Sequence, residues 1–233
     1  DKKTDRKAND DELPMHEVGL QEYKIGKYPV TVRQWRRFVE ATKYDKYDPA
    51  SLRDYDNRPA RWVSWDDAQA FCKWLTEEWR ASGRIKPDQV VRLPTEAEWE
   101  KAARHAPLPK REESGVRVYS WGNDFDPDKA NVMDTGIGDT SAVGCFPNGA
   151  SPHGCLDMIG NVWEWTNSKH EKYPYKANDG REDGKGDWFV LRGGAWSLDG
   201  VNARCARRLR APRDLLWFDP GFRVVAASPV SRS

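Results

Sequence analysis

The chain has 233 residues, and 38 Lys and Arg nearly balance 37 Asp and Glu, for a formal net charge of +1. This length fits one large domain or two small ones with a real core, and the charge balance argues against the broad basic field of a nucleic-acid-binding protein. No apolar run approaches the length of a membrane span, so we expect no membrane span. The sequence opens with no signal peptide and has no paired-cysteine framework, which favours a cytoplasmic location. We also expect a monomer.

Composition favours a fold rich in loops. Twelve Trp, 18 Gly and 15 Pro indicate aromatic side chains packed between turns and argue against a helical bundle. The four cysteines show no Cys-x-x-Cys spacing, so a zinc site is not expected. A disulfide between Cys145 and Cys155 is conceivable, because the Pro and Gly residues between them could reverse the chain. Four reduced thiols, including Cys72 and Cys205, are favoured over that bridge.

Helices are expected in the first half of the chain, after a charged segment. Residues 1–15 are polar, which predicts a tail or linker ahead of a single domain over residues 16–233. A strand is expected over 16–25, and another over 90–93. Three helices should begin after the capping residues Thr31, Ser64 and Thr95, the last running to about residue 104. The first of them should bury Val32, Trp35, Phe38 and Val39.

Helical periodicity disappears from residue 106 onward. Short apolar pieces alternate with turn signals, and we expect strands over residues 116–121, 142–146, 161–166, 189–192 and 221–227. Helices first, and strands with long loops later, indicate an α+β fold with much irregular structure.

The motif Gly-Asn-Val-Trp-Glu-Trp at residues 160–165 is the feature around which the chain is organised. In a strand, Val162 and Glu164 would lie on one face and the two indoles on the other. A buried carboxylate at Glu164 is costly unless something compensates it. Two partners remain open: a hard cation such as calcium, with Asp157 as a further ligand, or an arginine or backbone amides.

Six ordered motifs resemble the formylglycine-generating-enzyme-like family, whose fold is related to the C-type lectin domain. They are residues 25–31 (IGKYPVT), 63–68 (VSWDDA), 92–100 (RLPTEAEWE), 160–165 (GNVWEW), 191–196 (LRGGAW) and 221–223 (GFR). The resemblance covers residues 16–227 and implies a formylglycine-generating-enzyme or C-type-lectin-like α+β fold, with a few helices and short antiparallel strands. Family domains usually open with an apolar strand that ends in Met-Gly, and nothing here matches it.

The resemblance also implies calcium. Family calcium ligands correspond here to Asp157, Gly160, Val162 and Glu164. A second family calcium site would begin at Asn131 and Val132, with its acidic ligand matched either by Asp134 or by Thr135. We therefore expect a structural calcium ion.

The chain departs from the family at the catalytic residues. The enzyme that generates formylglycine binds copper(I) through two cysteines just after its Arg-Gly-Gly-Ser motif, and the matching residues 196–203 contain none, so no copper is expected. Cys205 matches a structural cysteine, and its family disulfide partner corresponds to Ala103. Iron-dependent sulfoxide-synthase relatives use a histidine triad, whereas this chain has four scattered histidines: His16, His105, His153 and His170. We therefore read the chain as a non-catalytic member.

Residues 196–218 have the composition of a protein-binding surface, in which Arg alternates with large apolar side chains. The alternative is that residues 215–218 are core under the Gly-Phe-Arg strand, which fits poorly beside the turn residues Pro212 and Pro220. The expected ligand-binding residues are Trp196, Ser197, Leu198, Asp199, Val201, Arg207, Leu209, Arg210, Arg213, Leu215, Leu216, Trp217 and Phe218.

The same segment resembles the variable region of proteins that are diversified by retroelements, which use a lectin-like scaffold to display changeable side chains. Three functions then compete: a module that binds a protein or other macromolecule, a metal-dependent oxidase, and an accessory domain of a larger signalling or defence protein. An intact cysteine pair would have favoured the oxidase, so the binding module comes first.

Overall fold

The helices begin where the sequence predicts them. A computed structural model describes residues 2, 5–105, 117–176 and 179–229. Within these ranges the α-helices are α1 (Val32–Thr42), α2 (Trp65–Ala81) and α3 (Glu96–Arg104). Thr31, Ser64 and Thr95 each accept a hydrogen bond from the backbone three residues on, and each forms a capping box. These local signals place all three N-termini correctly.

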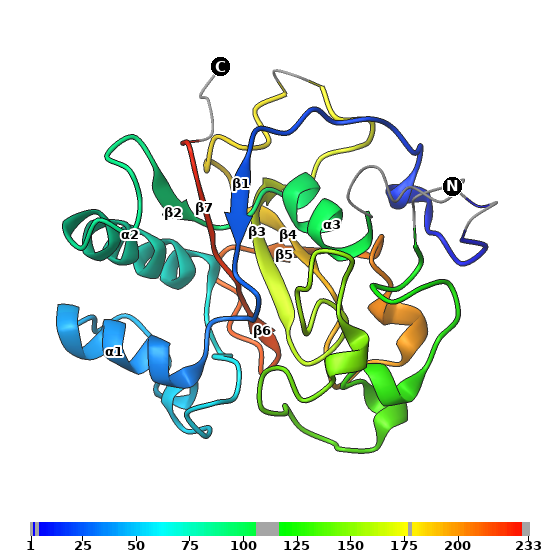
Figure 1. Cartoon of the computed structure of the whole chain (residues 1–233), viewed down its shortest axis with the longest axis horizontal. Coiled ribbons are helices and arrows are strands. Elements are labelled where there is room, and N and C mark those ends of the chain that lie inside the picture. Colours follow the sequence, from blue (N-terminus) through cyan, green and yellow to red (C-terminus); the bar gives the residue numbers. More distant parts are fainter. Residues whose placement is uncertain (1, 3–4, 106–116, 177–178, 230–233) are drawn as a thin grey trace.

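The strands form two small sheets around the centre of the molecule (Figure 1). One has the order β1-β7-β2 and is antiparallel; the other has the order β5-β4-β3-β6, with β6 parallel to β3. The strands are β1 (Tyr23–Ile25), β2 (Val90–Arg92), β3 (Trp163–Lys169), β4 (Trp188–Arg192), β5 (Arg208–Pro212), β6 (Pro220–Gly221) and β7 (Val225–Ala227). The α+β class is confirmed.

Two predicted strands are wrong. Residues 117–121 form turns with one isolated bridge between Tyr119 and Gly122, and Val116 lies outside the described residues. Residues 142–146 run through turns, and Val143 donates its N–H to the Asn57 carbonyl. Short apolar runs in this part of the chain pack as loops, because their backbone groups find loop partners instead of a sheet.

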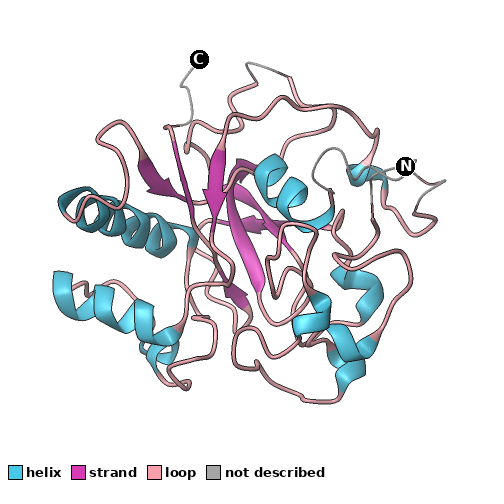
Figure 2. Ribbon diagram, in the orientation of Figure 1, coloured by secondary structure: helices cyan, strands magenta, loops and turns pink. Residues whose placement is uncertain are grey.

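Loops and turns, pink in Figure 2, make up much of the rest, together with short 3-10 helices. Within the described ranges these helices are η1 (Asp10–Glu12), η2 (Pro49–Leu52), η3 (Pro127–Lys129), η4 (Met133–Thr135), η5 (Pro147–Gly149) and η6 (Gly200–Ala203). No helix among the described residues has the length and apolar character needed to cross a membrane.

The main core lies where α1 and α2 pack against β3 and β4. The predicted stripe of α1 is buried, with Trp35 fully enclosed between Phe38, Phe71 and Phe222. A second cluster gathers around Trp99 of α3 and includes both Ala103 and Cys205, the residues that correspond to the family disulfide. All four cysteines are free, and Cys145 is the exposed one.

The first residues do not form the free tail that their composition predicts. Asp5 and Glu12 are buried, and both pair with the buried guanidinium of Arg204. The carbonyl of Asp11 accepts a hydrogen bond of 2.8 Å from Arg208. Charged residues near a terminus usually stay in water, but here two carboxylates meet an arginine that would otherwise be buried without a counter-charge.

Candidate binding surface

The acidic motif of α3 forms ion pairs that hold the fold together. Glu96 is fully buried and binds both Nε and Nη2 of Arg208, at 2.7 and 2.9 Å. Glu98 binds Arg92 through two bonds of 2.6 and 2.7 Å, and Glu100 pairs with the buried Arg192. Two parallel hydrogen bonds between a guanidinium and a carboxylate fix the orientation of the two side chains relative to each other. The motif is therefore a structural clamp between α3 and strands β2, β4 and β5.

Arg223 compensates the charge of Glu164. Glu164 is 0% exposed on β3, and Arg223 follows β6. Arg223 Nε and Nη2 donate to the two carboxylate oxygens at 2.6 and 2.7 Å, and Trp99 Nε1 donates to Oε2 at 2.6 Å. This geometry fits the arginine alternative for Glu164, because a guanidinium already occupies the position opposite the carboxylate.

The other predicted calcium ligands of this loop are Asp157, Gly160 and Val162, and each makes close contacts within the protein. Asp157 Oδ2 accepts the N–H of Gly144 at 2.6 Å, and burial raises the pKa of Asp157 to about 6. Gly160 has φ +73° and lies close to the Asn131 carbonyl, where a Cβ would collide. Val162 is buried beneath β6. Of these residues only Asp157 and Glu164 carry carboxylates, and each already accepts hydrogen bonds from the protein.

The second calcium position has a better candidate ligand. Asn131 Nδ2 donates to the Asp139 carbonyl at 2.9 Å, whereas Oδ1 is buried without a hydrogen-bond partner among the described residues. Val132 is buried, and its N–H donates to Thr135 Oγ1, while Asp134 accepts from Gly200. A buried amide oxygen without a donor suits a hard cation. Calcium binding stays a prediction, and Asn131 supports it more than Glu164 does.

Three consecutive apolar side chains stand out from the surface between β5 and β6. Leu216, Trp217 and Phe218 are 45%, 56% and 41% exposed. Leu215 differs, because it packs against the main core. The continuous run thus divides into one residue that holds the loop and three that face outward, so the core alternative applies to Leu215 alone.

Two half-buried tryptophans, Trp62 and Trp196, adjoin this exposed surface. The ring of Phe218 lies 5.6 Å from Trp196 and 6.4 Å from Trp62. Trp62 has φ +60°, a left-handed conformation that is rare and strained for a bulky residue. Strain of this kind costs about 1–3 kcal/mol and collects at functional sites. We call Trp62, Trp196, Leu216, Trp217 and Phe218 the aromatic patch.

The loops that carry the aromatic patch are held at their bases. Trp163 on β3 donates its N–H to the Asp219 carbonyl at 3.0 Å, and Asn161 accepts from the backbone of Trp196 at 3.2 Å. Ser197 Oγ donates to Asp219 Oδ2 at 3.0 Å. Burial raises the pKa of Asp219, whose other oxygen is enclosed. A rigid scaffold therefore presents exposed tips, which is common in binding loops.

The arginines do not surround the patch as the sequence pattern suggests. Arg208 is buried against Glu96, and Arg213 pairs with Asp66 on α2. Arg210 is exposed, but it lies 4.2 Å over the ring of Trp188 on the β4–β5 strand pair. Arg207 is half-buried. The aromatic side chains, and not the arginines, are what this surface offers.

Several other predicted ligand-binding residues contribute to the packing or capping of the fold. Leu198 and Leu209 pack against the main core, and Asp199 caps η6 by accepting the N–H of Asn202. Val201 on η6 is exposed. The sequence analysis did not identify Trp62, because its loop has no hydrophobic periodicity. Its approach to Phe218 also depends on a left-handed backbone conformation that the sequence does not predict.

The residues that align with the copper segment supply no thiolate. Leu198 and Ala203 are apolar, and Cys205 is buried so that the pKa of its thiol rises to about 12. Residues of the described ranges form no cluster of three or more His, Cys, Asp or Glu suited to a metal. The histidines are dispersed, with His16 between Tyr173 and Tyr175, and His170 3.6 Å from Asp11.

Comparison with known proteins identifies the fold and the relatives. A family model described as the sulfatase-modifying factor enzyme 1-like domain matches residues 2–228. Hercynine oxygenase of Mycolicibacterium smegmatis is 29% identical over 84% of this chain and 50% of that protein, so the chain spans about half the length of that relative. The inactive C-alpha-formylglycine-generating enzyme 2 of Bos taurus is 28% identical over 95% of this chain and 82% of its own length.

A solved structure agrees with this assignment of the fold. Treponema denticola variable protein 1 superposes with a TM-score of 0.69, covering 92% of this chain and 87% of that one at 23% identity. The predicted lectin-like, loop-rich fold is thereby confirmed. The relatives include proteins named as an oxygenase and as an inactive enzyme, so the comparisons by themselves leave open whether this chain is catalytic.

Proposed function

The chain belongs to the family of sulfatase-modifying factor enzyme 1-like domains, and we propose that it is a non-catalytic module that binds a macromolecular ligand through the aromatic patch. The exposure of Leu216, Trp217 and Phe218 carries this proposal. Aromatic side chains dominate protein-binding hot spots because they combine large area with few rotatable bonds. Contiguous exposed apolar side chains are unusual unless a partner covers them.

The strained backbone of Trp62 supports the same proposal. A left-handed tryptophan is retained only where the surrounding structure imposes it. Here the conformation brings a second indole to Phe218, 6.4 Å away, from a loop remote in sequence. A patch assembled from three separate segments, residues 62, 196 and 216–218, is the arrangement expected of a recognition surface on a fixed scaffold.

A selection experiment tests binding without knowledge of the partner. A displayed library of twelve-residue peptides is selected on the wild-type chain, and enriched peptides are measured against Trp217→Ala. We expect affinity to fall by about 2 kcal/mol or more, the range of a hot-spot residue. Trp188→Ala is the matched control, because Trp188 is 43% exposed but belongs to the β4–β5 pair. Peptides that tolerate Trp217→Ala would contradict the proposal.

The absence of catalysis has its own test. The purified chain should not oxidise a Cys-x-Pro-x-Arg peptide with copper and oxygen, because residues 196–203 contain no cysteine and the Cys205 thiol stays protonated. Product formation is measured by mass spectrometry against a heat-inactivated sample. Turnover above that control would favour the oxidase alternative.

The proposal concerns this domain alone. Because the chain spans about half of the hercynine oxygenases that it matches, the same patch could serve within a longer protein. Diversification of residues 196–219 by a retroelement remains part of the proposal as a hypothesis. A near-copy of their codons in the neighbouring genome would support it, and an intact neighbourhood without one would contradict it.

A further inference from the structure

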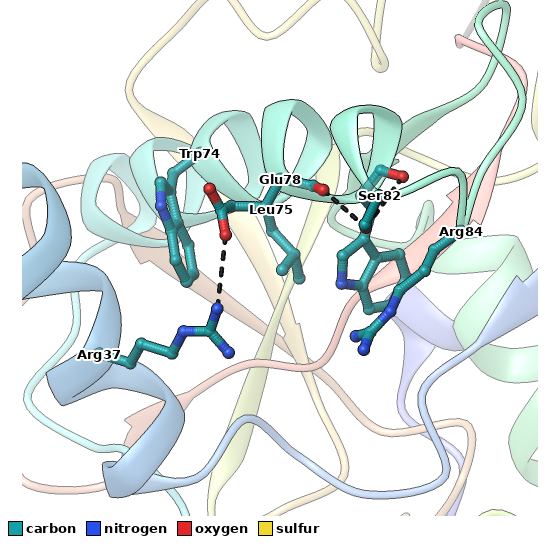
Figure 3. A pocket seen from close by; sticks show the side chains of 7 residues that line it. Arg37, Trp74, Leu75, Glu78, Ser82 and Arg84 are labelled. Carbon is teal, nitrogen blue, oxygen red and sulfur yellow. Dashed lines mark hydrogen bonds and ion pairs between the residues drawn. The ribbon is translucent and has the colours of Figure 1, made fainter.

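A groove on the helical side of the molecule contains side chains that the proposed function does not use. It has a volume of about 130 Å³ and lies between Arg37 of α1 and the C-terminal half of α2 (Figure 3). Trp74, Leu75 and Trp79 of α2 line it, and Arg84 lies on the side opposite Arg37. None of these residues belongs to the aromatic patch or to the ion pairs of α3.

The apolar part of the groove is rigid. Trp74 packs against Phe38 and Phe71, with ring centroids 5.6 and 5.5 Å apart. Trp79 packs on the cluster formed by Ile85, Val91 and Ala226, and Leu75 contacts both that cluster and the main core. Both indoles and Leu75 remain partly exposed. A ligand would therefore meet preformed aromatic walls and lose little affinity to ordering them.

The charges of the groove do not cancel. Arg37 lies 3.4 Å from Glu78, in an exposed pair, and 5.9 Å from the ring centroid of Trp74. Arg84 is exposed, and its guanidinium makes no hydrogen bond or ion pair within the described part of the chain. Figure 3 shows both guanidinium groups on the same side of α2, with Leu75 between them. One positive charge thus stays uncompensated beside the apolar wall.

We infer that this groove binds an acidic segment of a partner protein. An apolar side chain of that segment rests on Leu75 between the two indoles, and a neighbouring carboxylate pairs with Arg84. Charge complementarity selects an acidic segment over a basic or neutral one, because the unpaired guanidinium gains a charge-assisted hydrogen bond only from an anion. Trp and Arg are also the residues most enriched at binding hot spots.

The test uses the full chain labelled with nitrogen-15 at tryptophan. The indole N–H signals of Trp74 and Trp79 are assigned with Trp→Phe variants and followed during titration with N-acetyl-Glu-Leu-Glu-amide. We expect both signals to shift saturably, with a Kd of about 1 mM or below. N-acetyl-Gln-Leu-Gln-amide and N-acetyl-Glu-Ala-Glu-amide, which lack the charge or the large apolar side chain, should each bind about tenfold more weakly.

Arg84→Glu should remove the response, and Lys86→Glu is the matched control. Lys86 is exposed two residues away, so it undergoes the same charge reversal outside the groove. Trp217→Ala should leave the titration unchanged, which separates this site from the aromatic patch. Absent shifts, equal binding of the uncharged peptide, equal effects of the two charge reversals, or shifts confined to Trp196 and Trp217 would each overturn the inference.

Discussion

At the scale of single residues, the central motif is explained by a buried ion pair. The sequence left an arginine and a cation as alternatives for Glu164, and Arg223 takes that position through two short bonds. Spacing could show that the carboxylate needs a partner, but not which one. The partner lies 59 residues away in the sequence and reaches Glu164 only when β6 lies along β3.

Removing one partner of the Arg223–Glu164 pair should lower the stability of the fold. Arg223→Met leaves Glu164 buried without a counter-charge, so we expect the free energy of unfolding to fall by about 3–5 kcal/mol. The double variant Arg223→Met with Glu164→Gln should recover part of that loss, because no buried charge remains. Chemical denaturation measures both. A single variant as stable as the wild type would show that the pair contributes nothing to the fold.

Calcium is tested by linkage to stability. If the ion binds the folded chain alone, adding calcium after EGTA should raise the melting temperature. The rise in melting temperature is measured for the wild type, Asn131→Ala and Glu164→Gln, each relative to the same protein in EGTA. The variant with the smaller rise identifies the residue that binds the ion. We expect Asn131→Ala to reduce the rise more, since Glu164 is already paired. Identical melting curves with calcium and with EGTA would remove the metal from the account.

At the scale of elements, the sequence predicts what depends on neighbouring residues and misses what depends on distant ones. The helix starts at Thr31, Ser64 and Thr95 follow from capping boxes four residues long, and all are confirmed. The fate of each arginine could not be predicted in the same way. Arg208 finds its carboxylate on α3, 112 residues away, and composition alone makes it resemble a surface residue.

The N-terminal segment is the element whose role the sequence misses most. Asp5 and Glu12 are ordinary polar residues in a polar stretch, and only the fold places Arg204 beneath them. Because Arg204 is 2% exposed, its buried positive charge relies on this segment for carboxylate partners. The segment thus packs on the fold through Arg204, which follows η6 and donates to the Val201 carbonyl.

Deleting residues 1–13 should destabilise the domain by about 3–5 kcal/mol, because it leaves Arg204 buried and unpaired. The same deletion in an Arg204→Met background should cost much less, since the charge to be compensated is gone. The four unfolding free energies form a double-mutant cycle. Equal costs of the deletion in the two backgrounds would show that the ion pairs do not hold the segment.

At the scale of the whole molecule, a rigid core supports the loops that carry the aromatic patch. Helices α1 and α2 pack against β3 and β4 to form the core, and α3 clamps the strands through its three glutamates. The binding proposal uses the loops that leave β4 and β5, together with Trp62. The motifs predicted that scaffold, whereas the outward direction of residues 216–218 required the structure.

The unfolding free energy of Trp217→Ala tests the central claim most directly. If the aromatic patch is held exposed in the free protein, the change should stay within about 0.5 kcal/mol, as for surface substitutions. Trp165→Ala is the internal reference, because Trp165 is 0% exposed and its loss should cost about 3–5 kcal/mol. Chemical denaturation of both variants gives the comparison. A loss at Trp217 as large as that at Trp165 would mean that the patch is core, and would contradict the account.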